Sequence, residues 1–398
     1  MRFKEFKNPF QNFKCSEFLE FYSTNSLSWD QLSYDKESPL RNLHYGLIHN
    51  GAPTLIDSNE YQLPYAQANI KNYTLCKNGD VIFADASEDT KDICKPVEII
   101  NINNQNIVSG LHTIHARDIK NITVLGFKGY LFSSLKFHKQ ISRLTQGTKI
   151  YSINQSNFNE LYVGIPDKKE QTKIVDFLLK LDRRILTQNK IIKDLESQKK
   201  YILNLVFNFS KSNCTFQDLY VEAGEGGTPS TKQLENFENG NIPFIKIDDL
   251  SEKYLVKNKD FISKVGLENS SAWIIPQNSV IYSNGATIGR ISINTYPVTT
   301  KQGILGIVPS NNVLTEYLYY FMHSNYFKRQ VKKITTKGTM DCAYLKDLNT
   351  IKCFIPCIDQ QLECVKYFAA LDEKIQIEKR LLLSFKGQKR YFLKNIFI

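Results

Sequence analysis

Residues 165–207 read IPDKKEQTKIVDFLLKLDRRILTQNKIIKDLESQKKYILNLVF, and residues 355–397 read IPCIDQQLECVKYFAALDEKIQIEKRLLLSFKGQKRYFLKNIF. The two stretches align without a gap at a shift of 190 residues and are identical at twelve positions. The identical pairs are Ile165/Ile355, Pro166/Pro356, Gln171/Gln361, Val175/Val365, Leu181/Leu371, Asp182/Asp372, Ile185/Ile375, Gln198/Gln388, Lys199/Lys389, Tyr201/Tyr391, Leu203/Leu393 and Phe207/Phe397. A self-match of this length indicates an internal duplication, so the chain is expected to consist of two equivalent halves.

The repeated stretch is predicted to be a long helix in both copies. Its apolar residues recur at alternating steps of four and three, which is the heptad pattern of a coiled coil. The seam positions are Ile174, Leu178, Leu181, Ile185, Gln188, Ile192, Leu195, Lys199, Ile202 and Val206 in the first copy, and Cys364, Phe368, Leu371, Ile375, Glu378, Leu382, Phe385, Lys389, Phe392 and Ile396 in the second. Polar residues interrupt both copies at the same two steps, and such residues commonly fix the register of a coiled coil. We therefore expect two long helices that pair as an antiparallel coiled coil, rather than two ordinary core helices.

Length and composition set the broad class. A chain of 398 residues can form two or three domains with cores of their own. The N-terminal residues lack the apolar segment of a signal peptide, and no run of about 18 apolar residues occurs. The eight cysteines are scattered along the sequence. These features are typical of a cytoplasmic protein with reduced thiols, without disulfides or a metal site.

The duplication divides the chain into four segments. Two globular segments, 1–164 and 209–354, alternate with two helical spacers, 165–208 and 355–398. The elements predicted for the globular segments are strands at 81–84 and 99–108, a turn into a strand at 109–114 and a basic amphipathic helix at 130–144, then strands at 242–247 and 280–282 and a turn into a strand at 300–305. The fold class is therefore α+β, with two mixed α/β domains joined by the two helices in an internal pseudo-two-fold repeat.

The positive charge is concentrated in particular stretches. The net charge is +11, with +1, +4, +3 and +3 in the four successive segments. Acidic residues are missing from residues 119–159 and from residues 317–340, and both runs carry several lysine and arginine residues. One such run is most simply a solvated surface. Two runs at corresponding places in two halves favour two contacts with one long polyanion.

Short phrases in both halves resemble the DNA-specificity subunits of type I restriction-modification systems. The phrases are NGDVIFADASED (78–89), VSGLHT (108–113) and QGTKIYSI (146–153) in the first half, and GTPS (227–230), ATIG (286–289) and TKQG (300–303) in the second. An Ile-Pro pair begins each spacer, and Gln171 or Gln361 follows it. The order of these phrases covers essentially the whole chain and is specific, although each phrase alone is weak.

The resemblance implies a non-catalytic subunit that binds double-stranded DNA. Each globular segment would be a target-recognition domain that reads one half of a bipartite, asymmetric sequence. The paired helices would set the separation of the half-sites and dock two modification (methyltransferase) subunits, and restriction (translocase and nuclease) subunits can join the same assembly. The resemblance implies no cofactor on this chain, with S-adenosylmethionine and ATP expected on the partner subunits.

Two alternative functions remain, a self-contained DNA-modifying enzyme and a coiled-coil protein scaffold. The sequence gives little support to a self-contained DNA-modifying enzyme. The chain has no Pro-Pro and therefore lacks the Asn/Asp-Pro-Pro-aromatic motif of methyltransferases. Its glycine-rich loop 224–230 lacks the lysine of a phosphate-binding P-loop. Asp85 and the Asp89-Thr90-Lys91 stretch suggest a nuclease metal site only faintly. His112 and His115 would point to opposite faces of a strand, as one surface and one core histidine. A coiled-coil scaffold that binds protein only is the third hypothesis, and a salt-dependent DNA shift would exclude it.

The expected DNA contacts fall into two groups. Cations at helical spacing in the acid-free runs are assigned to phosphates, where they raise the affinity for every sequence. This group comprises Lys139, Arg143, Arg329, Lys332 and Lys333, and Lys128, Lys149 and Lys337 are further DNA contacts expected in the same runs. Residues in loops that differ between the halves are assigned to base edges. They are Lys301 and Gln302, with Asn284 and Arg290 behind them, and His49 and His112 in the first half.

Overall fold

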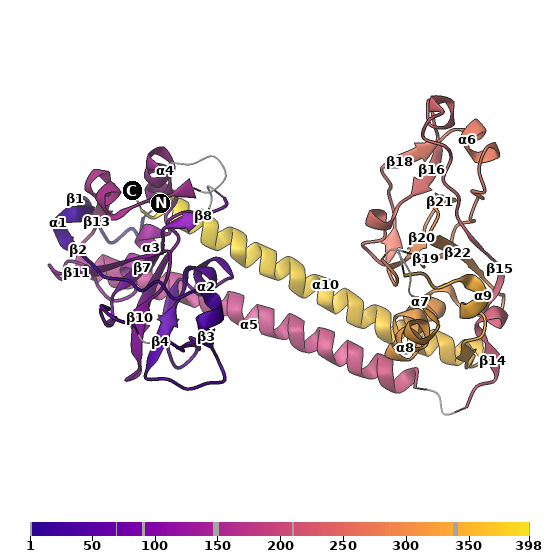
Figure 1. Ribbon diagram of the computed structural model, residues 1–398, viewed down its shortest axis with the longest axis horizontal. Helices are drawn as coiled ribbons and strands as arrows, with labels where there is room; N and C mark the ends of the chain where they lie inside the picture. Colours follow the sequence, from indigo (N-terminus) through magenta and orange to yellow (C-terminus); the bar gives the residue numbers. More distant parts are fainter. Residues whose placement is uncertain are drawn as a thin grey trace. The chain divides into compact units, whose positions relative to one another are not determined.

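The computed structural model describes residues 2–68, 70–89, 92–145, 151–208, 211–285, 287–336 and 341–397. The chain divides into two compact units (Figure 1). Unit 1 comprises Met1–Asn189 and Leu381–Ile398, and unit 2 comprises Lys190–Arg380. Each unit therefore contains one globular part and a portion of both long helices. Among the described residues, no helix combines the length and the apolar character that crossing a lipid bilayer requires.

Unit 1 is built on a five-stranded sheet with the strand order β2-β11-β7-β9-β5. The strands are β2 (Leu19–Tyr22), β11 (Thr113–Asp118), β7 (Val81–Ala84), β9 (Pro96–Asn101) and β5 (Leu55–Asp57). All neighbours are antiparallel except β5, which runs parallel to β9. Alternate side chains of β7 enter two separate cores, with Val81 and Phe83 on one face and Ile82 and Ala84 on the other. Because both faces of the strand are covered, its sequence is apolar throughout.

Three smaller sheets complete the globular part of unit 1. They are the four-stranded sheet β10 (Asn106–Ser109), β4 (Leu40–Leu43), β6 (Tyr65–Ala66) and β3 (Leu32–Ser33), and the pairs β1 (Gln11–Lys14) with β13 (Tyr162–Ile165) and β8 (Ala86–Ser87) with β12 (Tyr151–Ser152). The prediction of one strand over residues 99–108 was wrong, since a turn separates β9 from β10. Asn103 and Asn104 adopt left-handed backbone angles there (φ 43° and 58°). Asparagine tolerates this conformation better than most residues do.

Unit 2 repeats this architecture. Its five-stranded sheet has the order β15 (Tyr220–Glu225), β22 (Ile304–Pro309), β19 (Val280–Ser283), β20 (Ile291–Asn294) and β17 (Tyr254–Leu255). The edge strand β17 is again parallel to its neighbour, and the other pairs are antiparallel. The smaller sheets are β18 (Asp260–Ile262), β16 (Ile242–Ile245) and β21 (Thr299–Thr300), and the pair β14 (Cys214–Thr215) with β23 (Lys352–Cys353). The predicted α+β repeat is confirmed.

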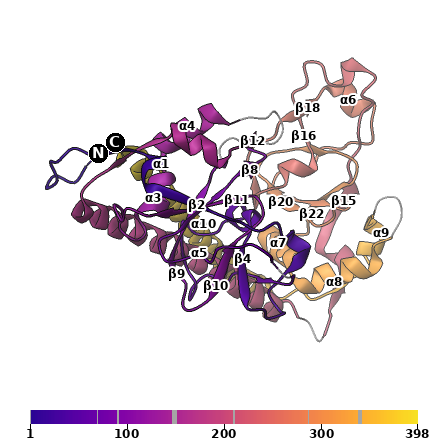
Figure 2. The same cartoon turned by 60° about the vertical axis from the view of Figure 1, so that its left-hand side comes forward.

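A pair of helices follows the five-stranded sheet in each unit (Figure 2). They are α3 (Phe127–Phe132) and α4 (Leu135–Leu144) in unit 1, and α7 (Thr315–His323) and α8 (Asn325–Ile334) in unit 2. The prediction of one continuous helix over residues 130–144 was wrong, because the extended residue Ser134 interrupts it and its hydroxyl accepts from the Phe137 N–H (3.3 Å). Ser324 caps α8 in the same way, accepting from the Phe327 N–H (3.2 Å). Serine is among the preferred N-cap residues.

Short helical segments connect these elements. The α-helical ones are α1 (Cys15–Phe18), α2 (Tyr45–His49), α6 (Lys264–Glu268) and α9 (Leu345–Leu348). The 3-10 segments are η1 (Trp29–Gln31), η2 (Gln155–Glu160), η3 (Phe216–Leu219), η4 (Leu234–Asn236) and η5 (Ile247–Asp249). Of these, α2 packs beside the turn that precedes β11, because Tyr45 contacts the ring of His112 there.

The two long helices are α5 (Lys168–Val206) and α10 (Ile358–Asn395). Every predicted seam position is buried or half-buried except Val206, which is 42% exposed. In unit 1, Phe177 near the start of α5 packs on Phe392 near the end of α10, with ring centroids 4.7 Å apart. In unit 2, Phe207 just beyond α5 lies 6.4 Å from Phe368 in the first part of α10. The helices therefore run antiparallel within each unit, which confirms the predicted coiled coil.

Polar groups tie both helices to the globular part of unit 1. The Tyr130 hydroxyl donates to Asp182 of α5 (2.8 Å), and Nζ of Lys389 of α10 lies 2.6 Å from the same carboxylate. The side chain of Gln171 accepts from one backbone N–H and donates to one carbonyl in the segment 122–124 (2.8 and 2.9 Å). These bonds fix the connection between β11 and α3.

Unit 2 contains the same polar groups with the two helices exchanged. The Tyr320 hydroxyl donates to Asp372 of α10 (2.8 Å), and Lys199 of α5 forms an ion pair with that carboxylate. Gln361 binds the backbone of residues 312–314 (2.9 and 2.8 Å). In both units, the aspartate and the lysine thus come from different helices.

Candidate nucleic-acid interface

Residues predicted to read bases lie at one end of the five-stranded sheet in each unit. In unit 1, the N–H of Asp85, just after β7, donates to the carbonyl of His112, just before β11 (3.0 Å). In unit 2, the N–H of Asn284 donates to the carbonyl of Gly303 in the same way (3.0 Å). Both turns use a left-handed residue, with φ 51° at His112 and 86° at Gly303. Glycine adopts this conformation freely, whereas a histidine there costs free energy and points to a function for its side chain.

His112 belongs to a compact group of polar and aromatic side chains. Its Nδ1 lies 3.3 Å from Oδ1 of Asp85, and its ring packs edge-on against Tyr45 of α2 with centroids 5.1 Å apart. His49, the last residue of α2, hydrogen-bonds through Nε2 with the Ala86 carbonyl (2.8 Å). Burial raises the pKa of Asp85, and the nearby imidazole of His112 counteracts this rise. The structure thus brings the two predicted histidines together.

Two members of this group were not predicted as DNA contacts. Asp85 could have been found from its place directly after a buried strand, where polar residues often belong to a binding site. No pattern in the sequence distinguished Tyr45 from the other tyrosines. Its position follows from the packing of α2, which only the structure shows.

The corresponding turn of unit 2 is held by its backbone. The Gln302 N–H donates to Oγ1 of Thr228 (3.3 Å), and the Gly303 N–H donates to Oε1 of Glu225 (2.7 Å). The side chains of Lys301 and Gln302 remain exposed. Lysine pairs with the acceptors of guanine and glutamine with adenine, so this turn can present two base-reading groups in a fixed orientation.

Arg290 lies close to the same end of the sheet. Its N–H donates to Oγ of Ser283 (2.8 Å), and its carbonyl accepts from the Ser283 N–H (2.9 Å). Its exposed side chain lines a cavity of about 850 Å³ within unit 2. Lys253 lines the same cavity, where Nζ donates to the Tyr320 hydroxyl (2.9 Å) and burial lowers the lysine pKa.

Two of the predicted DNA contacts are buried. Lys128 is 3% exposed, lies 3.3 Å from Glu98 and donates to Oγ1 of Thr123 (2.9 Å). Burial raises the pKa of Glu98, and the ammonium group of Lys128 counteracts this rise. Asn284 is 0% exposed, and its amide donates to the Ala343 carbonyl (3.3 Å). Neither side chain is available to DNA, so both are removed from the predicted interface.

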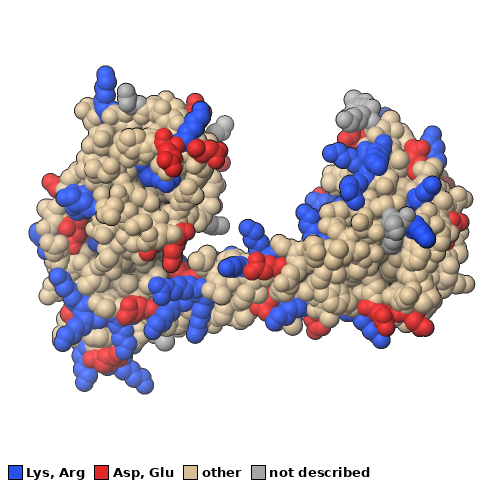
Figure 3. Space-filling view, turned by 90° about the horizontal axis from the view of Figure 1, so that it is seen from below, with Lys and Arg blue, Asp and Glu red and all other residues tan. Residues whose placement is uncertain are grey.

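The remaining cations lie on the exposed faces of α4 and α8. Each helix buries two side chains, Phe137 and Ile141 in α4, and Phe327 and Val331 in α8. The predicted phosphate contacts that are exposed are Lys139 and Arg143 on α4, and Arg329, Lys332 and Lys333 on α8. Lys149 and Lys337 lie outside the described residues. In the view of Figure 3, lysine and arginine side chains form several small groups, with acidic side chains among them.

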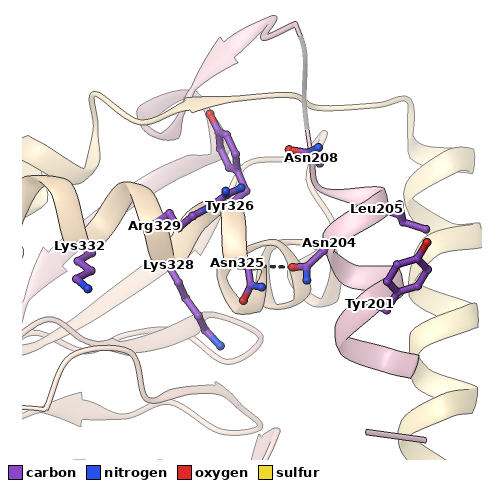
Figure 4. Close-up of a pocket in the computed structure, with 9 residues that line it drawn as sticks. All are labelled: Tyr201, Asn204, Leu205, Asn208, Asn325, Tyr326, Lys328, Arg329 and Lys332. Atoms are coloured by element: carbon purple, nitrogen blue, oxygen red, sulfur yellow. Dashed lines mark hydrogen bonds between the residues drawn. The ribbon is translucent and has the colours of Figure 1, made fainter. Parts of the chain in front are cut away.

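A pocket of about 550 Å³ lies in unit 2 between α8 and the end of α5 (Figure 4). Its lining residues are Tyr201, Asn204, Leu205, Asn208, Asn325, Tyr326, Lys328, Arg329 and Lys332. The Asn325 N–H donates to Oδ1 of Asn204 (3.4 Å), which joins the two walls. Burial lowers the pKa of Lys328, and the nearby Lys200 and Lys199 lower it further. The pocket therefore has an excess of positive charge and favours an anionic group.

A buried polar group in the core of unit 1 is structural. Cys76, Asp80 and His115 place possible ligand atoms within 4.8 Å of one another. However, both carboxylate oxygens of Asp80 accept from Arg117 (2.7 Å each), and Nε2 of His115 lies 2.7 Å from one of them. Burial acts to raise the pKa of Asp80, but these hydrogen bonds hold it below its ordinary value. His115 is fully buried and His112 is exposed, which confirms the predicted division between them.

Comparisons with known protein sequences agree with this geometry. The family model of the type I restriction modification DNA specificity domain matches residues 56–197 and 218–384. The putative type I restriction enzyme MjaX specificity subunit of Methanocaldococcus jannaschii is 24% identical over 336 residues, which cover 79% of this chain and 76% of the relative. The EcoR124I/EcoR124II specificity subunit of Escherichia coli is 26% identical over 233 residues, 54% and 57% of the two chains. The MjaIX specificity subunit of Methanocaldococcus jannaschii is 27% identical over 162 residues, and the match spans only 37% of its length.

Two solved structures share the fold. A chain from a study of complex assembly and conformational transition of the type I R-M system has a TM-score of 0.64 at 15% identity, covering 97% of both chains. The S subunit of a type I restriction-modification system from M. genitalium has a TM-score of 0.55 at 16% identity, covering 100% of this chain and 99% of that one. At this identity the likeness concerns the fold alone.

Proposed function

Because the chain belongs to the type I restriction modification DNA specificity family, we propose that it selects the DNA target of a restriction-modification complex. Residues 1–164 and 209–354 are the two target-recognition domains, and residues 165–208 and 355–398 are the helical spacers. Each domain reads one half of a bipartite, asymmetric sequence. The relatives named as specificity subunits support this proposal.

One observation carries the proposal. The same end of the same five-stranded sheet carries different side chains in the two units: Asp85 and His112 in unit 1, and Lys301 and Gln302 in unit 2. An enzyme that had been duplicated would be expected to keep a common set of catalytic groups at this place. A common scaffold with different polar side chains at one sheet end suits the recognition of two different base sequences.

The basic helices supply the part of the binding energy that does not depend on sequence. Lys139 and Arg143 on α4, and Arg329, Lys332 and Lys333 on α8, contact phosphates. His49 and His112 with Asp85 read the first half-site, and Lys301, Gln302 and Arg290 read the second. Asp85 contributes an acceptor for the amino group of cytosine or adenine, a group that the cationic side chains of unit 2 cannot recognise.

The partners follow from the same assignment. The helices set the spacing between the half-sites and bind two modification subunits, and restriction subunits complete the nuclease. S-adenosylmethionine and ATP are bound by those partners, and this chain performs no catalysis itself.

Methylome sequencing of cells that express the chain with its modification subunit tests the proposal. We expect one bipartite methylated motif, and no methyl transfer by the purified chain alone. Inserting one heptad near Gln188 together with one near Glu378 should lengthen the spacer of the motif while both half-sites stay the same, because the seam is preserved. Methyl transfer by the single chain, or a motif without two separated halves, would contradict the proposal.

A further inference from the structure

His44 of unit 1 holds a buried hydrogen-bond donor without a partner. It is the N-cap residue of α2, and its Nδ1 accepts from the Gly46 N–H (3.0 Å). A neutral imidazole whose Nδ1 accepts carries its proton on Nε2, so Nε2 is a donor. His44 is 4% exposed, and its Nε2 finds no hydrogen-bond partner in the part of the chain that the structure describes. Unpaired buried donors are rare in folded proteins because they cost free energy, so this one indicates a function.

The surroundings of His44 keep its ring neutral. Burial lowers the pKa of His44, and the nearby imidazole of His112 lowers it further. Two aromatic rings pack against it, with centroids 4.6 Å away for Tyr45 and 5.6 Å away for Trp29. His44 therefore offers a donor without a positive charge, which suits a single acceptor atom better than a phosphate.

His44 also lies directly beside the turn that carries His112. The Tyr45 N–H donates to the carbonyl of Leu111 (3.3 Å), and the Tyr45 ring contacts the rings of both histidines. The turn can approach this closely only because residue 110 is a glycine, since a Cβ atom on Gly110 would lie 2.9 Å from Cα of His44. His44 thus belongs to the same group as the predicted reading residues of unit 1.

Unit 2 has a different donor at the corresponding place. The last carbonyl of β4 accepts from the Gly110 N–H (2.9 Å), and the last carbonyl of β16 accepts from the Lys301 N–H (3.0 Å). The residue that follows is His44 in unit 1 and Lys246 in unit 2. Lys246 is exposed, and its Nζ lies 2.7 Å from Asp260. Both units therefore place a donor beside the reading turn, and the difference between the donors suits the recognition of different bases.

Trp29 is the side chain that can uncover His44. It lies in the short segment η1 and is 48% exposed, whereas Tyr45 is half-buried and bonded to the turn through its backbone. Because nearly half of the Trp29 side chain already faces solvent, moving it off the ring of His44 exposes little additional apolar surface.

We infer that His44 is a third base-reading histidine of unit 1, whose Nε2–H donates to one acceptor on a base edge after Trp29 has moved off its ring. The inference rests on the proposed function and adds a recognition group for the first half-site. Guanine, adenine and thymine present acceptors in the major groove, whereas cytosine presents a donor there. His44 therefore rejects cytosine at the base that it contacts.

Two substitutions separate the donor of His44 from its role as a helix cap. Asparagine is a preferred N-cap residue and can accept from the Gly46 N–H, but its short amide does not reach the position of Nε2. Glutamine is longer and can place an amide N–H near that position, although it is not among the preferred caps. The two variants should therefore change stability and recognition in opposite orders.

Binding of the methyltransferase complex to a panel of single-base variants of its target measures recognition. His44→Asn should keep the wild-type melting temperature and lose about fivefold to tenfold of the preference against cytosine at one position of the first half-site, the effect of one hydrogen bond. His44→Gln should have the lower melting temperature and keep the preference. The second half-site should be unchanged in both variants.

Tryptophan fluorescence tests the movement of Trp29. The chain has two tryptophans, and the buried Nε1 of Trp273 has no hydrogen-bond partner among the described residues. Trp273→Phe therefore breaks no such bond and leaves Trp29 as the reporter. Target DNA should change the emission of Trp29, and DNA of unrelated sequence should not. Unchanged emission with target DNA would overturn the uncovering of His44.

His138→Asn is the matched control, because His138 is a half-buried histidine of unit 1 that lies on α4, outside the group around His112. It should leave every base preference unchanged. The inference is overturned if His44→Asn keeps the wild-type preference throughout the first half-site, or if His44→Gln loses the preference as fully as His44→Asn does. Either result with a wild-type complex that still binds its target specifically overturns this inference alone, whereas a wild-type complex without sequence-specific DNA binding overturns the proposed function.

Discussion

Unit 1 has a histidine, His112, at the left-handed turn where unit 2 has Gly303, and a partly exposed aspartate, Asp85, where unit 2 has the buried Asn284. The two units share the order of the five-stranded sheet, the serine caps of α4 and α8 and the Tyr–Asp–Lys groups. Side chains that join one element to another are thus the same in both units. Side chains at the end of the sheet near His112 and Gly303 differ.

One difference lies inside the scaffold. Directly before β7, unit 1 has Asp80, which is paired with Arg117 and His115. Directly before β19, unit 2 has Ser279. Ser279 donates to the Pro276 carbonyl (2.8 Å) and needs no charged partner. Unit 1 thus depends on a buried ion pair where unit 2 uses a neutral hydrogen bond.

The largest predicted effect is on the stability of unit 1 and follows from this buried ion pair. Asp80→Ala should lower the free energy of unfolding of unit 1 by about 3 to 5 kcal/mol, because it leaves the buried charge of its partners without a counter-ion. Ser279→Ala should cost unit 2 only about 1 kcal/mol, the loss of one hydrogen bond. Hydrogen exchange of peptides from each unit in increasing urea measures both values. Equal losses in the two units would show that the ion pair contributes no more than the serine.

Lowering the pH should destabilise unit 1 more than unit 2. The folded-state pKa of Asp80 is lowered, so its contribution to stability is present above the ordinary aspartate pKa of about 4 and is lost as the pH falls through the lowered value. Unit 1 should therefore lose more protection from exchange than unit 2 when the pH is lowered below about 4. In Asp80→Asn this extra loss should disappear. A wild-type chain whose units lose protection in parallel would contradict the prediction.

Base discrimination is the next smaller effect, and it should be confined to one half-site. Lys301→Ala should relax the preference at one position of the second half-site by about 1 to 3 kcal/mol, and His112→Ala should do so in the first. Binding to a panel of single-base variants of the target measures the change. If Lys301→Ala weakens binding to every variant equally, its side chain contacts the backbone and the assignment is wrong.

The smallest expected effect should be the same in both units. Arg143→Ala on α4 and Lys333→Ala on α8 should weaken binding to all sequences alike, and each should reduce the slope of log K against log salt by about 1. Titrations at several salt concentrations determine the slope. An unchanged slope in Arg143→Ala would exclude α4 from the phosphate contacts.

Local patterns and the repeat made much of the fold predictable from the sequence. The heptads of the spacers and the apolar strand predicted at residues 81–84 follow from patterns of neighbouring residues. The failures have a different origin. The break at Ser134 depends on whether a hydroxyl caps a helix, and residues 130–144 are equally amphipathic with or without that break.

The candidate site was predictable only in part, for a similar reason. Lys128 lies in an acid-free run, but its carboxylate partner Glu98 is 30 residues away in the sequence and reaches it through the folding of β9 against α3. Asn284 lies beside Gly303 at the end of β19, yet it is buried and its amide donates to the Ala343 carbonyl, so the expected base contact is not available. A sequence pattern identifies the side chains near a site, while long-range contacts decide which of them remain free.

Each unit contains part of both long helices, and this sharing sets the order in which a growing chain can complete the two units. Unit 2 consists of residues 190–380 without interruption, so all of its parts, including Lys199 and Asp372, have been synthesised before the last stretch of the chain. Unit 1 begins first but requires Lys389 and Phe392 from that last stretch. Domains generally fold during synthesis as their residues emerge from the ribosome. Unit 1 therefore has to wait, with its Tyr130–Asp182 pair lacking the lysine, until residues 381–397 have been synthesised, so the unit that is begun first is completed last.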